Sequence, residues 1–351
     1  MSAEMSRRAF LKASAATMTA IMTDSAIIGY AAPVSGAVRI PEVDKLTVTV
    51  ITDNYYDTFR PNTAIVNRFS MLDASETKSF IHAEHGLSYH IVTEINGETH
   101  SFLFDYGLDA HGVNQNIDLL KIDLAKVEAL GLSHGHVDHW ATLIPLLKQH
   151  REQFIKNLPL YVGEEAFAKR FIKREDHTAS IGRLSREEIE ELGFVKIIEI
   201  SEPTPIAPGA YLTGTIARKT EYEKIQPYLI IQRGDVLEQD SLRGEQSLVV
   251  NIKGKGLVVL TSCAHSGVIN TTKHAQAMTQ VKKVHAVMGG FHLTGAKPEI
   301  IDKTIADMKA IAPDYIVPMH CVGFEAQAAF AREMPKEFIL NTAGSKYTFS
   351  S

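Results

Sequence analysis

The segment Ser133-His134-Gly135-His136-Val137-Asp138-His139 decides how this chain of 351 residues is interpreted. The apolar stretch 127–132 before it predicts a strand, and an apolar helical pattern begins at Trp140 after it. A loop between a strand and a helix can turn His134 and His136 to one side, while Asp138 and His139 face a neighbouring point. Imidazole and carboxylate donors at this density favour a site for zinc, iron or manganese over a histidine-rich loop that only caps a helix.

The composition around this segment is typical of a folded globular protein. Hydrophobic residues make up 45% of the chain and charged residues 22%, which excludes a disordered chain, a collagen-like repeat and a coiled coil. The formal net charge of −5 gives no bulk attraction to nucleic acid, so no nucleic-acid partner is expected. Two cysteines exclude a disulfide-dense scaffold. A disulfide between Cys263 and Cys321, two inert core thiols and one thiolate ligand all remain open.

Residues 1–31 predict a targeting segment. The run Ser6-Arg7-Arg8-Ala9-Phe10-Leu11-Lys12, followed by small and apolar residues, resembles a twin-arginine signal peptide with cleavage after Ala31. Asp24 interrupts the apolar run, so no permanent membrane anchor is expected. We therefore expect export by the twin-arginine machinery and a periplasmic or extracytoplasmic location.

The mature part, residues 40–351, is expected to form one elaborated domain. Strand patterns bounded by turn residues lie at 46–51, 87–93, 101–104, 127–132, 158–162, 195–200, 228–231, 247–252, 256–260, 285–288 and 315–317. Helical patterns lie at 141–153, 164–173, 186–192, 270–281, 298–312 and 325–333. This order predicts a layered α/β arrangement of two sheets with helices outside. The charged segment at about 149–245 is expected to be an insertion draped over that core.

Several motifs resemble one known family. His134-x-His136-x-Asp138-His139 resembles the signature of the metallo-β-lactamase fold superfamily, and 102–107 resembles the strand and Asp-x-Gly turn upstream of it. Other segments resemble the 7,8-dihydropterin-6-methyl-4-(β-D-ribofuranosyl)aminobenzene 5′-phosphate synthase-like branch; they are 53–54, 83–88, 209–214, 245–248, 263–267, 289–293 and 318–323. The resemblance spans about residues 46–350. It implies a four-layer αββα sandwich with one or two metals in a cleft at the sheet edges.

The resemblance places the remaining metal ligands after later strands. His265 follows the apolar run 256–260, where the superfamily usually presents a bridging aspartate. No aspartate is there, so His265 is expected to substitute as a ligand, with Cys263 as a second possibility because a thiolate also binds zinc. His320 follows 315–318 and matches the last ligand histidine of the superfamily.

Six residues are therefore expected to hold one or two divalent metal ions, with zinc preferred and iron or manganese as alternatives. They are His134, His136 and His265 for one ion and Asp138, His139 and His320 for the second. The superfamily also draws a ligand histidine from the region after the signature, but the matching stretch 208–214 contains none. His177 is the only histidine between His150 and His265, but it lies among charged residues that indicate a surface position. Without a ligand histidine from this region, the number of metals stays open.

Three residues are expected to act on the substrate. His292 follows the strand 285–288 and is either a ligand or, as we favour, a proton donor or substrate contact beside the metal. Asp138 is expected to orient the attacking water and accept its proton. His85 either lines the cleft as a substrate contact or is a buried structural histidine.

The predicted function is a metal-dependent hydrolase that uses a metal-activated water on a small-molecule ester, lactone or phosphoester. The resemblance implies an alternative, a synthase that transfers a dihydropterin-methyl group and releases diphosphate. Export argues against that reaction because both substrates would be cytoplasmic intermediates. A non-catalytic metal-containing binding protein is a third alternative, disfavoured because structural zinc sites close all four positions with Cys and His.

Overall fold

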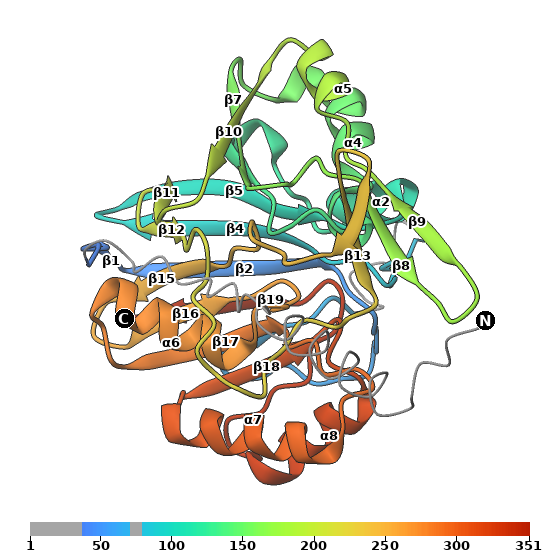
Figure 1. The fold of residues 1–351 in the computed structure, drawn as a ribbon. Coiled ribbons are helices and arrows are strands. Elements are labelled where there is room, and N and C mark those ends of the chain that lie inside the picture. Colours follow the sequence, from blue (N-terminus) through green and yellow to red (C-terminus); the bar gives the residue numbers. More distant parts are fainter. Residues whose placement is uncertain (1–36, 71–78) are drawn as a thin grey trace, which may run out of the picture. The chain divides into compact units, whose positions relative to one another are not determined.

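The computed structural model describes residues 37–70 and 79–351. The predicted signal peptide at 1–31 lies outside these ranges and stays a prediction. Two main sheets face each other, and helices cover the outer side of each (Figure 1). Within the described ranges, no helix combines the length and the apolar character needed to cross a membrane.

The first sheet has eight strands in the order β10-β7-β6-β5-β4-β2-β19-β3. Their bounds in chain order are β2 (Lys45–Thr52), β3 (Val66–Asn67), β4 (Ser88–Ile95), β5 (Glu98–Tyr106), β6 (Val127–Gly131), β7 (Leu158–Gly163), β10 (Val195–Ile200) and β19 (Lys346–Ser350). Strands β5, β6, β7 and β10 pair in parallel, whereas the pairs from β5 to β3 are antiparallel. The β6 end that leads into the histidine motif therefore lies beside the end of β5.

The second sheet has seven strands, six of them in the order β11-β12-β15-β16-β17-β18, and β1 pairs with β15. Their bounds are β1 (Glu42–Val43), β11 (Thr204–Ala207), β12 (Ala210–Leu212), β15 (Leu248–Ile252), β16 (Gly256–Leu260), β17 (Val284–Gly290) and β18 (Tyr315–Met319). Strands β16, β17 and β18 are parallel, so their carboxyl ends meet at one edge of the sheet.

An apolar core lies between the two sheets, and further apolar clusters lie under the helices. Side chains such as Val48, Phe102 and Met288 form the central core. The first sheet is covered by helices α2 (Ala110–Leu119), α4 (Leu143–Gln149) and α5 (Arg186–Glu191), with α3 (Val137–Trp140) and the 3-10 turns Leu124–Lys126 and Arg151–Gln153 in the connections. The second sheet is covered by α6 (Val268–Thr279), α7 (Pro298–Ile311) and α8 (Phe324–Glu333). The predicted four-layer αββα sandwich is confirmed.

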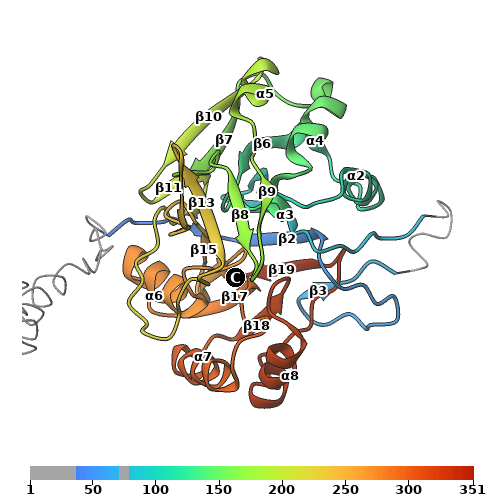
Figure 2. The same ribbon diagram turned by 45° about the vertical axis from the view of Figure 1, so that its right-hand side comes forward.

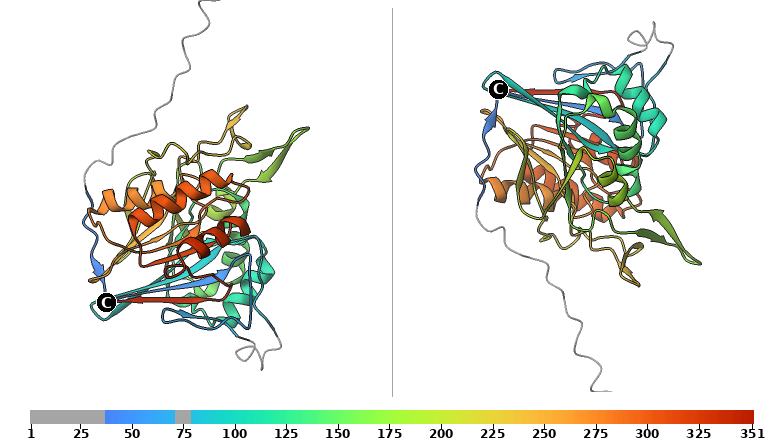
Figure 3. Two further views of the ribbon diagram at one scale, coloured as in Figure 1. Left: turned by 90° about the horizontal axis from the view of Figure 1, so that it is seen from below. Right: turned by 90° about the horizontal axis from the view of Figure 1, so that it is seen from above.

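A third sheet of four strands stands apart from the sandwich, in the order β14-β13-β8-β9. Its strands are β8 (Arg170–Lys173), β9 (Thr178–Gly182), β13 (Leu229–Arg233) and β14 (Val236–Gln239). Figure 2 shows β8, β9 and β13 in front of the main sheets, and Figure 3 shows the β8–β9 hairpin extending away from them.

The expected insertion at 149–245 only partly matches this arrangement. Strands β7 and β10 belong to the first sheet and β11 and β12 to the second, so only the four-stranded sheet and its connections stand apart. The helix predicted at 164–173 is wrong, because 170–173 forms strand β8. The apolar residues Phe171 and Ile172 pair with β13, a distant partner that a local helical period cannot reveal.

Candidate metal centre

The predicted donors gather where several strands end at one edge of the sandwich. Strand β6 leads into the motif 133–139, β16 into Cys263 and His265, β17 into His292, and β18 into His320. Because β16, β17 and β18 are parallel neighbours, the loops that follow them lie side by side. Three groups of donor atoms result, and two of them include residues of the motif 133–139; the third joins Cys263, His292 and Cys321.

The three-histidine cluster consists of His134, His136 and His265. One ring nitrogen from each residue lies within 4.8 Å of the others, and all three side chains are buried. The Nε2 atoms of His134 and His265 are 3.2 Å apart. Zinc–nitrogen bonds of about 2.0–2.1 Å in tetrahedral geometry place two ligand nitrogens about 3.3 Å apart. The spacing of this pair therefore fits a single ion between the rings.

Burial keeps these three imidazoles in the neutral form that binds metal. Burial, helped by the positive charge of Arg170, lowers the pKa of His136 to about 3. Burial also holds the pKa of His134 and His265 well below the usual histidine range, and neighbouring histidines add to the effect. The cluster can thus accept a cation without first releasing protons.

The mixed cluster consists of Asp138, His139, Cys263 and His320, whose donor atoms also lie within 4.8 Å of one another. The Nε2 atom of His139 is 3.2 Å from the Cys263 sulfur and 3.4 Å from Asp138 Oδ2. The Nε2 atom of His320 is 3.3 Å from the same carboxylate oxygen. Carboxylate, imidazole and thiol groups at these separations form a second donor set that suits zinc.

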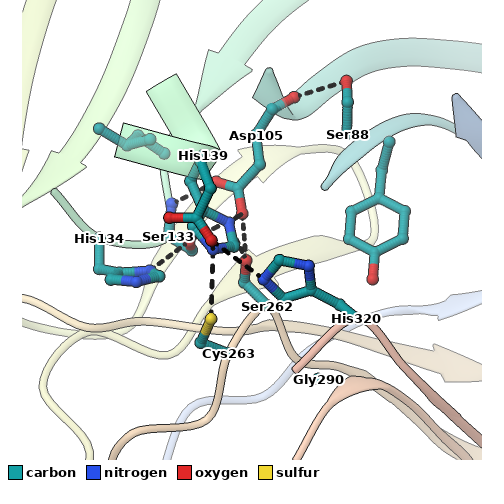
Figure 4. A network of polar contacts seen from close by, with 12 residues as sticks. Ser88, Asp105, Ser133, His134, His139, Ser262, Cys263, Gly290 and His320 are labelled. Atoms are coloured by element: carbon teal, nitrogen blue, oxygen red, sulfur yellow. Dashed lines mark hydrogen bonds and ion pairs between the residues drawn. The ribbon is translucent and has the colours of Figure 1, made fainter. Parts of the chain in front are cut away.

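Asp105 orients His139 within the mixed cluster (Figure 4). Its Oδ2 lies 2.8 Å from His139 Nδ1 and also accepts a hydrogen bond from Ser262, while Ser133 donates both its backbone N–H and its hydroxyl to the carboxylate. This arrangement leaves the Nε2 atom of His139 facing Cys263. A carboxylate behind a histidine in this way fixes the ring for metal binding.

The electrostatics of the mixed cluster follow from its carboxylates. Burial lowers the pKa of His139, but Asp138 and Asp105 outweigh burial and raise the pKa to about 10. Burial opposes ionisation of Asp138, yet His139 and His320 outweigh it and hold the pKa of this carboxyl well below its usual range. Asp138 therefore stays ionised, as a metal ligand must be.

Two buried carboxylates hold the backbone of the later ligands. Glu245 accepts the backbone N–H of His265 at 2.6 Å and that of Ser266 at 2.5 Å. Asp53 accepts the backbone N–H of His320 at 3.0 Å. Both acids lie in the family-like segments 53–54 and 245–248, to whose acidic residues the sequence assigned no role.

Several buried ring nitrogens lack a hydrogen-bond partner among the described residues. At the centre they are the Nδ1 atoms of His265, His292 and His320. Buried polar atoms in folded proteins nearly always have a partner, so such atoms indicate a missing ion or water. Together with the donor spacing, this observation shows that the residues of the centre fit metal ions.

His292 lies beside the three-histidine cluster. Its ring centroid is 4.1 Å from that of His265, and one of its donor atoms lies within 4.8 Å of the sulfurs of Cys263 and Cys321. Burial lowers the pKa of His292, but the Cys321 sulfur and the Glu245 carboxylate outweigh it and raise the pKa above the usual value. These positions allow either of the two roles considered for it, ligand or proton donor.

His85 lies at the mouth of the centre and not in the core. Its side chain is 63% exposed, its ring stacks on that of His320 at 4.8 Å, and its Nε2 is 3.8 Å from Asp138 Oδ2. Asn54 Oδ1 lies 3.1 Å from the other ring nitrogen of His85.

His177 is placed differently. It is exposed next to β9 and paired with Asp176, and it does not join either cluster.

Arg170 is a residue of the centre that motif reasoning did not assign. Its buried guanidinium pairs with Asp240 at 2.7 Å and donates to the carbonyl of Gly135, inside the histidine motif. A β-carbon at Gly135 would lie 2.1 Å from the arginine Nη1 atom. Glycine at this position thus lets Arg170 of the four-stranded sheet pack against the metal-binding loop.

Comparison with known proteins places this arrangement among characterised folds. No family model matches the chain. The chain is 29% identical over 273 residues to the 7,8-dihydropterin-6-methyl-4-(β-D-ribofuranosyl)-aminobenzene-5′-phosphate synthase of Methanocaldococcus jannaschii, covering 76% of this chain and 90% of that protein. It is 28% identical over 256 residues to an uncharacterized protein of the same organism; the match covers 73% of this chain and 90% of that protein.

A solved structure described as a metal-dependent hydrolase of the β-lactamase superfamily superimposes with a TM-score of 0.67. The identity is 22%, and the alignment covers 87% of this chain and 100% of the other. At this identity the match establishes the fold alone. The chain has the metallo-β-lactamase fold.

Proposed function

We propose that the protein is a metal-dependent hydrolase with two metal ions. The observation that carries this proposal is the presence of two adjacent donor clusters supplied by one motif and two later strand ends, those of β16 and β18. The first ion is held by the three-histidine cluster, and the second by the mixed cluster, with Cys263 at the strand end where the superfamily usually has an aspartate. A carboxylate in the mixed cluster distinguishes the centre from structural zinc sites, which use only Cys and His.

Zinc is the ion that we propose, because imidazole, thiol and carboxylate donors occur together. Thiolate ligands favour zinc over magnesium, calcium and manganese. When bound, the ions polarise the scissile carbonyl or phosphoryl oxygen and make a water nucleophilic near neutral pH.

The residues of the chain position the reactants. Asp138 is 18% exposed at its side chain and lies 3.8 Å from His85 Nε2 and 3.3 Å from His320 Nε2, where its free lone pairs can orient the attacking water and accept its proton. His292, beside His265, donates a proton to the leaving group. His85 at the mouth contacts the substrate, an ester, lactone or phosphoester.

A second candidate is the reaction named for the archaeal synthase, transfer of a dihydropterin-methyl group with release of diphosphate. The identity of 29% over 273 residues, which cover 76% of this chain and 90% of the synthase, supports it. The same residues would then hold ions that neutralise the departing diphosphate. The two candidates differ in the nucleophile, which is water in the hydrolase and an aromatic substrate in the synthase.

One experiment separates these candidates from each other and from a binding protein. Purified protein is analysed by elemental mass spectrometry and then assayed, with and without chelator, on a panel of esters, lactones and phosphodiesters and on the pterin diphosphate with its acceptor. Chelator-sensitive hydrolysis that is restored by zinc supports the hydrolase, and diphosphate release that requires the acceptor supports the synthase. Unfolding on chelation, with no turnover of any substrate, would show a structural metal and overturn the proposal.

We also propose that the protein is exported. The run Ser6–Lys12 and the apolar residues after it support a twin-arginine signal, and release of the mature chain after Ala31 is expected. Replacement of Arg7 and Arg8 by lysine should retain the protein in the cytoplasm. Equal periplasmic amounts of both forms in fractionated cells would contradict export by this route.

A further inference from the structure

The two cysteines of the chain meet across a glycine at the end of a strand. Cys263 follows β16 and Cys321 follows β18, and β17 lies between these strands in the sheet. Strand β17 ends at Gly290, whose position is so confined that a β-carbon would lie 2.7 Å from the Cys321 sulfur and 3.2 Å from the Cys263 Cα. Because glycine has no side chain there, the two loops touch beyond the end of β17.

Both thiols are buried and close to each other. Cys263 is 3% exposed and Cys321 is 6% exposed. Their sulfur atoms lie within 4.8 Å of each other, and the Cys321 sulfur lies 3.4 Å from the backbone carbonyl oxygen of Cys263. A bond between them needs an approach to about 2.05 Å, which rotations of two short side chains can supply over this gap.

Cys263 faces two partners at once. On one side its sulfur is 3.2 Å from His139 Nε2 in the mixed cluster, and on the other it adjoins Cys321. A sulfur in a disulfide has no thiolate charge to offer a metal ion. Binding of the second metal and formation of a disulfide therefore exclude each other at this atom.

We propose that Cys263 and Cys321 form a reversible disulfide that competes with the metal of the mixed cluster for the Cys263 sulfur. The competition rests on the proposed metal centre, whereas the cysteine pair itself does not. The centre would then lose its second metal under oxidising conditions and regain it after reduction.

Hydrogen peroxide is the class of oxidant that fits two buried thiols, because it is small. One thiol takes an oxygen atom from peroxide and becomes a sulfenic acid, with release of one water. The second sulfur then attacks the sulfenic sulfur, the S–S bond forms, and a second water leaves. Two thiols are oxidised by two electrons in total and one peroxide is reduced to two waters. A dithiol reverses the step by exchange.

The test uses the full mature protein, metal-loaded or stripped with chelator, treated with hydrogen peroxide. The sample is then denatured, its free thiols are alkylated, and peptides are analysed by mass spectrometry. We expect the stripped protein to yield a cross-linked peptide pair containing Cys263 and Cys321, and no such pair after dithiothreitol. The loaded protein should form the cross-link at least tenfold more slowly. Since the chain has no other cysteine, disulfide shuffling cannot create the signal.

The matched control is Cys321→Ser, which keeps the mixed cluster complete. Before oxidation it should bind the same amount of metal as wild type, and after oxidation it should show a trapped sulfenic acid at Cys263 and no cross-link. Two alkylatable thiols in stripped, peroxide-treated wild type would overturn the disulfide. A cross-link that forms equally fast with and without metal would overturn the competition. Absence of metal from the untreated protein would instead refute the proposed metal centre. The cross-link alone would then decide whether the two cysteines form a disulfide.

Discussion

Asp105→Asn is the substitution that most directly tests how the second metal ligand is positioned. The carboxylate of Asp105 is completely buried and faces His139 Nδ1 at 2.8 Å, while Ser133 and Ser262 donate to it as well. Asparagine keeps the shape but replaces one acceptor oxygen with an N–H₂ group and removes the negative charge. The ring of His139 then loses the acceptor that keeps its Nε2 atom available for metal.

The expected size of the effect follows from these contacts. Loss of such a supporting carboxylate lowers metal affinity about 10- to 100-fold, which equals about 1.4–2.8 kcal/mol. Only the mixed cluster should be affected, because the three-histidine cluster has no contact with Asp105 other than through Ser133. One ion should therefore dissociate at lower chelator concentration while the other keeps its wild-type affinity.

The assay is chelator competition followed by elemental mass spectrometry of the protein fraction. Asp314→Asn is the matched control, because Asp314 makes the same kind of contact with His285 at 2.6 Å but belongs to neither cluster. Wild-type affinity at both sites in Asp105→Asn, or an equal loss in Asp314→Asn, would refute the reasoning.

Three further outcomes are expected. Chelation should abolish turnover but leave the circular dichroism spectrum unchanged, since the apolar cores do not depend on metal; loss of the spectrum would contradict this. Gly135→Ala should lower the free energy of unfolding by about 1–3 kcal/mol, because the new methyl group would meet Arg170, and urea unfolding measures it. Burial raises the pKa of Glu223 from 4.5 to about 7, so its contribution to stability is complete below pH 4.5 and is lost as the pH rises to 7. The free energy of unfolding of Glu223→Gln should therefore exceed that of wild type at pH 8, by about 3 kcal/mol at most. Urea unfolding at pH 4 and pH 8 measures this difference. Equal free energies of unfolding for the two proteins at both pH values would argue against it.

The sequence indicates the centre of the fold better than its edges. Strands β2, β4, β5, β6 and β7 and strands β15 to β18 are predicted because each contains a β-branched, alternating or apolar run between turn residues. Strand β19 was not predicted, although Tyr347 and Phe349 alternate with polar residues; it has only five residues and pairs with β2, which is distant in the sequence. Helix α2 was also missed, although Asp109 caps it by accepting the backbone N–H groups of His111 and Gly112.

The candidate site divides in a similar way. The grouping of His134 and His136 with His265, and of Asp138 and His139 with His320, was expected from the resemblance, and the structure brings these side chains together in those two groups. Their role as ligands remains a proposal. Support from Arg170, Asp53 and Glu245 could not be predicted, because it depends on backbone contacts between residues 20 to 267 positions apart in the chain.

The most direct test of the account is the metal content of the wild-type protein, His265→Ala and His177→Ala, purified in parallel and measured by elemental mass spectrometry. His265 supplies a donor to the three-histidine cluster, whereas His177 is exposed and pairs with Asp176. The account predicts two metal ions in wild type and in His177→Ala, and one or none in His265→Ala. Two ions in all three proteins would contradict it and would move the third ligand of that cluster to His292 or Cys263.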